Sequence, residues 1–109
     1  MKIIALSDLH GNLDRLDAIA DELRAADLLL VSGDITKSGS ADEDAGIIRT
    51  LQEYNAALLA VHGNRDFPEV ATALDEAGVG LHARGTIVDG IGFFGAGGGR
   101  TTRFHTACE

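Results

Sequence analysis

The sequence has little cysteine, little proline and few aromatic residues, and it contains no long hydrophobic run. Its single cysteine, Cys108, cannot form an intrachain disulfide, which is typical of a reducing, cytoplasmic setting. No apolar stretch approaches the roughly 20 residues of a transmembrane helix. The segment after Lys2 lacks the small-residue cleavage site of a signal peptide. We therefore expect a cytoplasmic protein with no membrane partner.

Positive charge is scarce as well. Nine lysines and arginines stand against 17 acidic residues, and the formal net charge is −8. Such a surface repels the phosphates of nucleic acids, which argues against a DNA-binding module. If the substrate is an anionic phosphate, bound metal ions must supply the missing positive charge. The length of 109 residues and the hydrophobic content of 45% predict one globular domain covering residues 1–109.

Three short apolar runs are each followed by a loop whose side chains can bind a metal. The runs are residues 3–6, 28–31 and 57–61. The loops that follow contain Asp8 and His10, Asp34, and Asn64. Each run is typical of a buried parallel strand, and ligands of an open parallel sheet bind beyond the carboxyl ends of its strands. We therefore expect these four side chains to meet in one small volume.

Helical spacing of apolar residues separates the strands. The predicted helices are residues 13–23, 41–54 and 68–77. Asn12 is the expected cap of the first helix, and Ser40 with Glu43 is a capping-box pattern for the second. Pro68 suits the first turn of the third helix, which Gly78 ends.

The last third of the chain predicts antiparallel structure. Residues 79–82 are expected to form a short strand, and residues 86–94 a β-hairpin that turns at Asp89-Gly90. The glycine-rich residues 95–99 lack the Lys-Ser/Thr of a phosphate-binding loop, so we do not expect a nucleotide there. The fold class is therefore α/β, a parallel βαβαβα sheet with a C-terminal β-hairpin and helices covering the sheet faces.

The spacing of the polar residues suggests how they bind metal. In an extended segment Asp8 and His10 point the same way, so they can hold one cation from two sides. Asp34 can bridge two cations, and Asn64 offers a neutral oxygen to the second. Two such ions roughly 3.5–4 Å apart can activate a water and bind both oxygens of a phosphoryl ester. Mixed oxygen and imidazole ligands favour Mn, Fe, Zn or Ni over Ca.

In this order, each after a strand, the motifs resemble those of calcineurin-like metallophosphoesterases, in their small bacterial and archaeal Icc-like branch. The matching segments are Asp8-Leu9-His10, Gly33-Asp34 and Gly63-Asn64-Arg65-Asp66, for D-x-H, G-D and G-N-[HRC]-[DE]. The resemblance implies the first half of an α/β/β/α sandwich and hydrolysis of a small phosphate mono- or diester. It also implies that Asp8 and His10 hold one metal, Asp34 bridges, and Asn64 holds a second.

Two departures from the family pattern affect the catalytic interpretation. Arg65 replaces a frequent histidine, and an arginine can bind phosphate but cannot act as the acid, so Asn64 and Arg65 are the candidate catalytic residues. The family's later Gly-His-x-His segment is missing, so the domain is expected to be C-terminally truncated and catalytically incomplete. The alternative function is a non-catalytic remnant that binds partners or forms a homo-oligomer.

Several residues have a simpler structural interpretation. We expect Asp66 to bond loop amides or cap the third helix, His62 to be a satisfied loop histidine, and His82 to be a surface or core residue. His105 is a less favoured substitute for a lost ligand, and Cys108 is not expected to be reactive.

Overall fold

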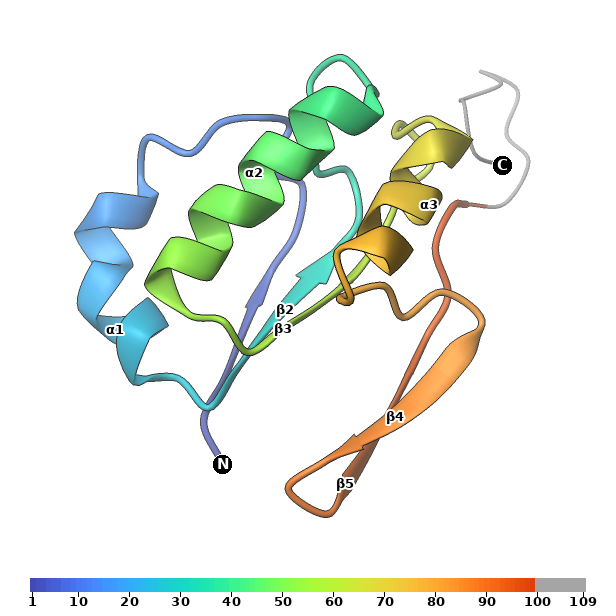
Figure 1. The fold of residues 1–109 in the computed structure, drawn as a ribbon. Helices are drawn as coiled ribbons and strands as arrows, with labels where there is room; N and C mark the ends of the chain where they lie inside the picture. The colour runs from blue at the N-terminus through green and yellow to red at the C-terminus, as the bar shows by residue number, and fades with distance from the viewer. Residues whose placement is uncertain (100–109) are drawn as a thin grey trace.

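A parallel three-stranded sheet and a separate antiparallel hairpin make up the strands of the computed structural model, which describes residues 1–99 (Figure 1). The elements are β1 (Ile3–Leu6), the 3₁₀ helix η1 (Leu16–Ile19), α1 (Ala20–Ala25), β2 (Leu28–Ser32), α2 (Ala41–Tyr54), β3 (Leu58–Val61), α3 (Pro68–Glu76), β4 (Arg84–Val88) and β5 (Ile91–Gly95). This is the predicted α/β class, with the parallel sheet first and the hairpin last. None of the helices within this range is long and apolar enough to span a bilayer.

The helices lie on one side of the sheet, although the sequence predicted helices over its faces generally (Figure 1). The strand order β1-β2-β3 explains the difference. Right-handed crossovers that always step in the same direction place every connecting helix on the same face. The hydrophobic core therefore forms between this face and the helices, and includes Leu29, Val31, Ile48, Leu51 and Leu58.

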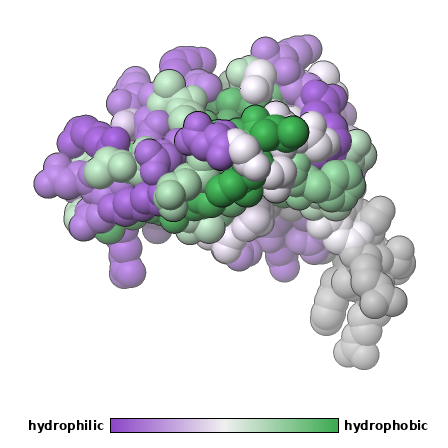
Figure 2. Space-filling model, turned by 90° about the horizontal axis from the view of Figure 1, so that it is seen from below, coloured by the Kyte–Doolittle hydropathy of each residue, from purple (hydrophilic) through white to green (hydrophobic). Residues whose placement is uncertain are grey.

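In the described part of the chain, no helix covers the opposite face of the sheet. Ile3 is 39% exposed there, and Ser32 is exposed at the end of β2. Leu59 and Val61 of β3, together with Phe94 of β5, line a cavity of about 140 Å³. Seen from below, hydrophobic side chains form a band across the middle of the molecule between polar areas (Figure 2). An incompletely covered apolar sheet face is therefore part of this fold.

The first helix is shorter than predicted, and its expected cap has another role. Asn12 Oδ1 accepts a hydrogen bond from the amide of Asp14 at 3.1 Å, which closes a local turn instead of starting a helix. Helical structure begins at Leu16 as a 3₁₀ turn and becomes α-helical at Ala20. The prediction of a helix from residue 13 was therefore wrong by about one turn.

The second helix begins where the sequence predicted. Ser40 Oγ accepts a hydrogen bond from the amide of Glu43 at 3.2 Å, which is an N-cap. The Glu43 carboxylate does not return to the Ser40 amide, as it does in a full capping box. It binds the amides of Lys37 and Ser38 instead, at 2.5 and 2.9 Å, and so holds the loop before the helix.

The hairpin is confirmed, but the predicted strand at residues 79–82 is not. That segment makes only isolated bridges, Gly80 with Ala60 and His82 with Gly95. It cannot continue as a strand because Ala83 adopts φ +54° and turns the chain into β4. Asp89 and Gly90 have φ +50° and +78°, as a tight hairpin turn requires.

Candidate metal centre

The loops after β1 and β2 are joined by backbone hydrogen bonds that continue the pairing of the two strands. The amides of Asp8 and His10 donate to the carbonyls of Gly33 and Asp34 at 3.2 and 2.9 Å. The next amide, that of Gly11, donates to Ile35 at 2.9 Å. Two segments more than 20 residues apart in the chain are thus held side by side, and their polar side chains emerge at the same edge of the sheet.

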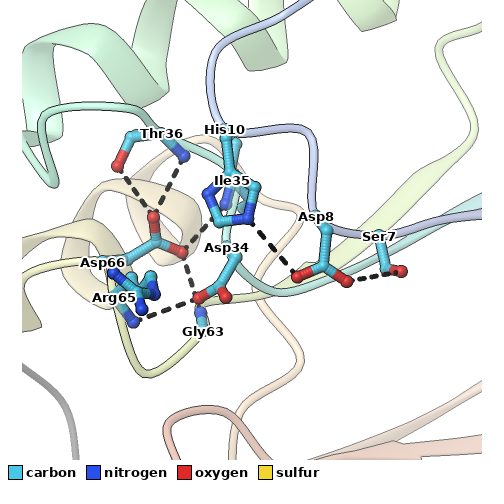
Figure 3. Close-up of polar contacts among 9 residues, drawn as sticks. All are labelled: Ser7, Asp8, His10, Asp34, Ile35, Thr36, Gly63, Arg65 and Asp66. Carbon is cyan, nitrogen blue, oxygen red and sulfur yellow. Dashed lines mark hydrogen bonds and ion pairs between the residues drawn. The ribbon is translucent and has the colours of Figure 1, made fainter. Parts of the chain in front are cut away.

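Three of the four predicted ligands converge at this edge (Figure 3). One possible donor atom from each of Asp8, His10 and Asp34 lies within 4.8 Å of the others. His10 Nε2 is 3.5 Å from Asp8 Oδ1. Asp8 and His10 are exposed and Asp34 is half-buried. Within residues 1–99 no other set of three histidine, cysteine or acidic side chains meets in this way.

The reason why these side chains meet differs from the one that the sequence suggested. Asp8 and His10 are not in an extended segment, because their φ angles are +54° and +48°, and Asp34 has φ +48°. These three are among only five non-glycine residues with positive φ in residues 1–99. Aspartate and histidine tolerate this left-handed conformation better than most residues. Backbone strain of this kind concentrates at functional sites.

The donor set fits a divalent cation. Asp8 and Asp34 bring two carboxylates together in a chain of net charge −8, and their repulsion favours a bound positive charge. No lysine or arginine side chain of residues 1–99 lies within the 4.0 Å ion-pair distance of either carboxylate. Two carboxylates and an imidazole are the mixed ligands that transition metals accept.

The turn after β3 is fitted closely against Asp34. Asp34 Oδ1 accepts a hydrogen bond from the amide of Arg65 at 3.0 Å. A Cβ added to Gly63 would lie 2.1 Å from that same oxygen, so only glycine allows this approach. Asn64 is half-buried between Gly63 and the exposed Arg65. Its position is next to the site, and the ligand role of Asn64 and the catalytic role of Arg65 stay predictions.

Asp66 is structural, as the sequence indicated, and it connects two of the three loops. It is fully buried, and its carboxylate accepts hydrogen bonds from the amides of Gly63, Thr36 and Ile35 at 2.8, 3.0 and 3.1 Å. The Thr36 hydroxyl adds a fourth at 2.7 Å. Burial alone would raise the pKa of Asp66, but these donors lower it below its ordinary value. Asp66 therefore holds the Asp34 loop against the Asn64 turn.

The remaining histidines lie outside the candidate centre or outside the described residues. His62 is buried, and its Nδ1 has no hydrogen-bond partner within residues 1–99, so the expectation of a satisfied histidine was wrong. The ring of His82 packs edge-on against it at 5.0 Å, and His82 Nδ1 accepts from the Gly97 amide at 2.7 Å. His82 is exposed, as predicted. His105 and Cys108 lie outside the described range.

One buried acid was missed by the sequence interpretation. Asp44 of α2 is 1% exposed, and its Oδ1 has no partner within the described part of the chain. Burial, followed by the negative charges of Asp66 and Glu43, raises the pKa of Asp44 to about 7. Asp44 shares the helix face of Ile47, Ile48 and Leu51, and this spacing of three and four residues was the available signal.

An open cavity of about 590 Å³ lies directly beside the centre. Asp8 and His10 line one part of it, and Asn12, Asp14 and Lys37 line the rest. The cavity is within the size range of small-molecule sites. A ligand that reaches a cation at the centre therefore has room to extend along the loop after β1.

Comparison with known proteins agrees with this geometry. A family model described as calcineurin-like phosphoesterase matches residues 1–107. The chain is 35% identical over 109 residues to the uncharacterized protein MJ1162 of Methanocaldococcus jannaschii. The aligned region covers 100% of this chain and 49% of that protein. The chain thus spans about half the length of the curated relative that it matches. The matched residues include the three loops at the carboxyl edge of the sheet, and the chain belongs to the calcineurin-like phosphoesterases.

Proposed function

We propose that this chain is the metal-binding part of a phosphoesterase that hydrolyses a small phosphate mono- or diester. The observation that supports the proposal is the convergence of Asp8, His10 and Asp34 to within 4.8 Å, in loops that match the family. The family predicts divalent metals, and the ligand types favour Mn, Fe, Zn or Ni, two ions per site. The cytoplasmic location predicted from the sequence belongs to this proposal.

Each residue of the proposed site has a distinct role in binding the metal ions or the phosphate. Asp8 and His10 would hold the first ion, Asp34 would bridge the two ions, and Asn64 would add an oxygen ligand to the second. When bound, the ions supply Lewis acidity toward the phosphoryl oxygens and lower the pKa of a bound water. Arg65, exposed on the turn after Asn64, places its guanidinium to bind the phosphate.

We further propose that residues 1–99 do not complete the metal shells. The first ion has one histidine and two carboxylates from this chain, and the second has only Asp34 and Asn64. Two protein ligands seldom hold a transition ion tightly, so the second ion is expected to bind weakly. Because the chain spans about half of its relative, the activity of a whole protein remains a proposal.

A non-catalytic binding or oligomerising module is the second candidate function. The exposed apolar side chains favour it, since Phe94 is 76% exposed and Ile87 is 75% exposed. Contiguous apolar patches of this kind often mark protein interfaces. A chain that binds no metal but associates through this face would fit this function and not the phosphoesterase.

Metal titration tests the phosphoesterase proposal directly. We expect Mn²⁺ to bind the wild-type chain, as measured by calorimetry and by loss of the electron paramagnetic resonance signal of free Mn²⁺. The variant Asp34→Asn should weaken binding by about tenfold or more, because it removes a charged ligand. Asp21→Asn, on an exposed residue of α1, removes the same charge and is the matched control. Equal affinities of all three proteins would contradict the proposal.

A further inference from the structure

Among the residues that the structure describes, Lys37 is the only lysine or arginine that lines the cavity beside the metal centre. The other charged side chains of the lining are Asp8, Asp14 and, when protonated, His10. Lys37 is therefore a cation among carboxylates in a cavity beside a candidate phosphate site, where it could bind an anionic group.

The backbone of Lys37 is held firmly. Its amide donates to Glu43 Oε2 at 2.5 Å, and the Ser38 amide and hydroxyl donate to Glu43 Oε1 at 2.9 and 2.6 Å. Burial alone would raise the pKa of Glu43, but these donors lower it below its usual value. A Cβ added to Gly11 would lie 3.2 Å from Lys37 Cβ, so the turn after His10 packs directly on this loop. The base of the lysine side chain is therefore placed next to the metal-binding loop.

Within the described residues 1–99, the ammonium group of Lys37 makes no ion pair. Within residues 1–99 no carboxylate lies within 4.0 Å of it, although Asp14 lines the same cavity. Glu43, whose carboxylate accepts from the Lys37 amide, uses both of its oxygens on backbone amides. In a chain of net charge −8 this cation is left available to a ligand.

We propose that Lys37 binds a second anionic group on the substrate. This rests on the proposed function, in which the phosphate to be cleaved binds at Asp8, His10 and Asp34. The cavity continues from Asp8 and His10 to Lys37, so the leaving group of the ester lies along it. Without Lys37 that part of the cavity is negative through Asp14 and repels an anion. The preferred substrates are therefore small phosphoesters whose leaving group has a further phosphate or carboxylate.

Binding measurements on the chain with Mn²⁺ test this preference without requiring turnover. The probes are glycerol 3-phosphate, 3-phosphoglycerate, which adds a carboxylate, and 1,3-propanediol bisphosphate, which adds a phosphate. We expect the two probes with a second anion to bind about threefold to tenfold more tightly than glycerol 3-phosphate, the range of an exposed to half-buried charge pair. The ratio of the affinities of these two probes shows whether a carboxylate or a phosphate is the preferred second anion. The gain should disappear in high salt, since an exposed pair is screened.

Three variants identify the side chain responsible. Lys37→Gln should abolish the gain, and Lys37→Arg, which keeps the charge, should retain it. Lys2→Gln is the matched control, because Lys2 is the only other lysine in the chain and lies at the amino end of β1, opposite the site. The Lys2 variant should leave the gain unchanged.

The outcomes separate this inference from the proposed function. If Mn²⁺ does not promote binding of glycerol 3-phosphate to the wild type, the proposed function is wrong and the inference with it. If Mn²⁺ promotes that binding but a second anion adds no affinity, only the inference is wrong. A gain that persists in Lys37→Gln also refutes the inference and leaves the function standing.

Discussion

The buried carboxyl of Asp44 makes a pH-dependent prediction about stability. Its side chain is 1% exposed, and its Oδ1 has no partner within residues 1–99. Burial, followed by the negative charges of Asp66 and Glu43, raises the pKa of Asp44 from 3.8 to about 7. The ionised form is therefore unfavourable in the folded chain and unhindered in the unfolded chain.

The sign of the effect follows from these two pKa values. The folded-state pKa is the higher one, so the protonated acid contributes fully below about pH 4, and this contribution is lost as the pH rises through about 7. The shift corresponds to roughly 4 kcal/mol in the free energy of unfolding. Asp44→Asn removes the charge without changing the shape. The asparagine amide must also find acceptors for its own N–H groups, which offsets part of the gain. We therefore expect the free energy of unfolding of the variant to exceed that of wild type by roughly 2–4 kcal/mol at pH 8.

Urea unfolding followed by circular dichroism at pH 5, 6, 7 and 8, with metal removed by EDTA, measures this difference. At pH 5 the two proteins should have nearly equal free energies of unfolding, and the advantage of Asp44→Asn should grow with each step. Asp42→Asn, an exposed carboxylate in the same first turn of α2, is the control and should follow wild type. An advantage of Asp44→Asn that stays constant from pH 5 to pH 8 would refute the reasoning.

Four further predictions concern the loops, helix α2 and the sheet face. Asp66→Asn should lower the free energy of unfolding by about 2–4 kcal/mol in urea, because the buried carboxylate accepts four hydrogen bonds. Gly63→Ala should cost about 2 kcal/mol or more and weaken Mn²⁺ binding, since its Cβ would lie 2.1 Å from Asp34 Oδ1. A Cβ added to Gly46 of α2 would meet no atom within 4 Å, so Gly46→Ala should instead stabilise the helix by about 0.5–1 kcal/mol. If the chain forms a homo-oligomer through its open face, Phe94→Ser should lower the mass seen by light scattering, and an unchanged mass would contradict that interface.

Much of the candidate site could be predicted because its signals are local. The aspartate and histidine after β1 and the Gly-Asp after β2 each follow an apolar strand, and parallel strands that end together bring their loops together. The structural role of Asp66, in bonding loop amides, was also predicted from its place before a helix. Lys37 and Asp44 were missed. A single lysine in a loop has no pattern of its own, and the signal for Asp44 was its place on the helix face of Ile47, Ile48 and Leu51.

Apart from the strand expected at residues 79–82, the sequence by itself determined the order and type of the elements and the family of the chain. Apolar spacing, the Ser40 cap and the Asp89-Gly90 turn act within a few residues, so they need no tertiary contact. Only the tertiary structure decided that the helices within residues 1–99 lie on one face, and that His62 Nδ1 has no hydrogen-bond partner within those residues. It also decided the left-handed backbone of the ligand loops. The physical reason is that these features depend on hydrogen bonds and packing between segments more than 20 residues apart, and sequence periodicity does not describe such contacts.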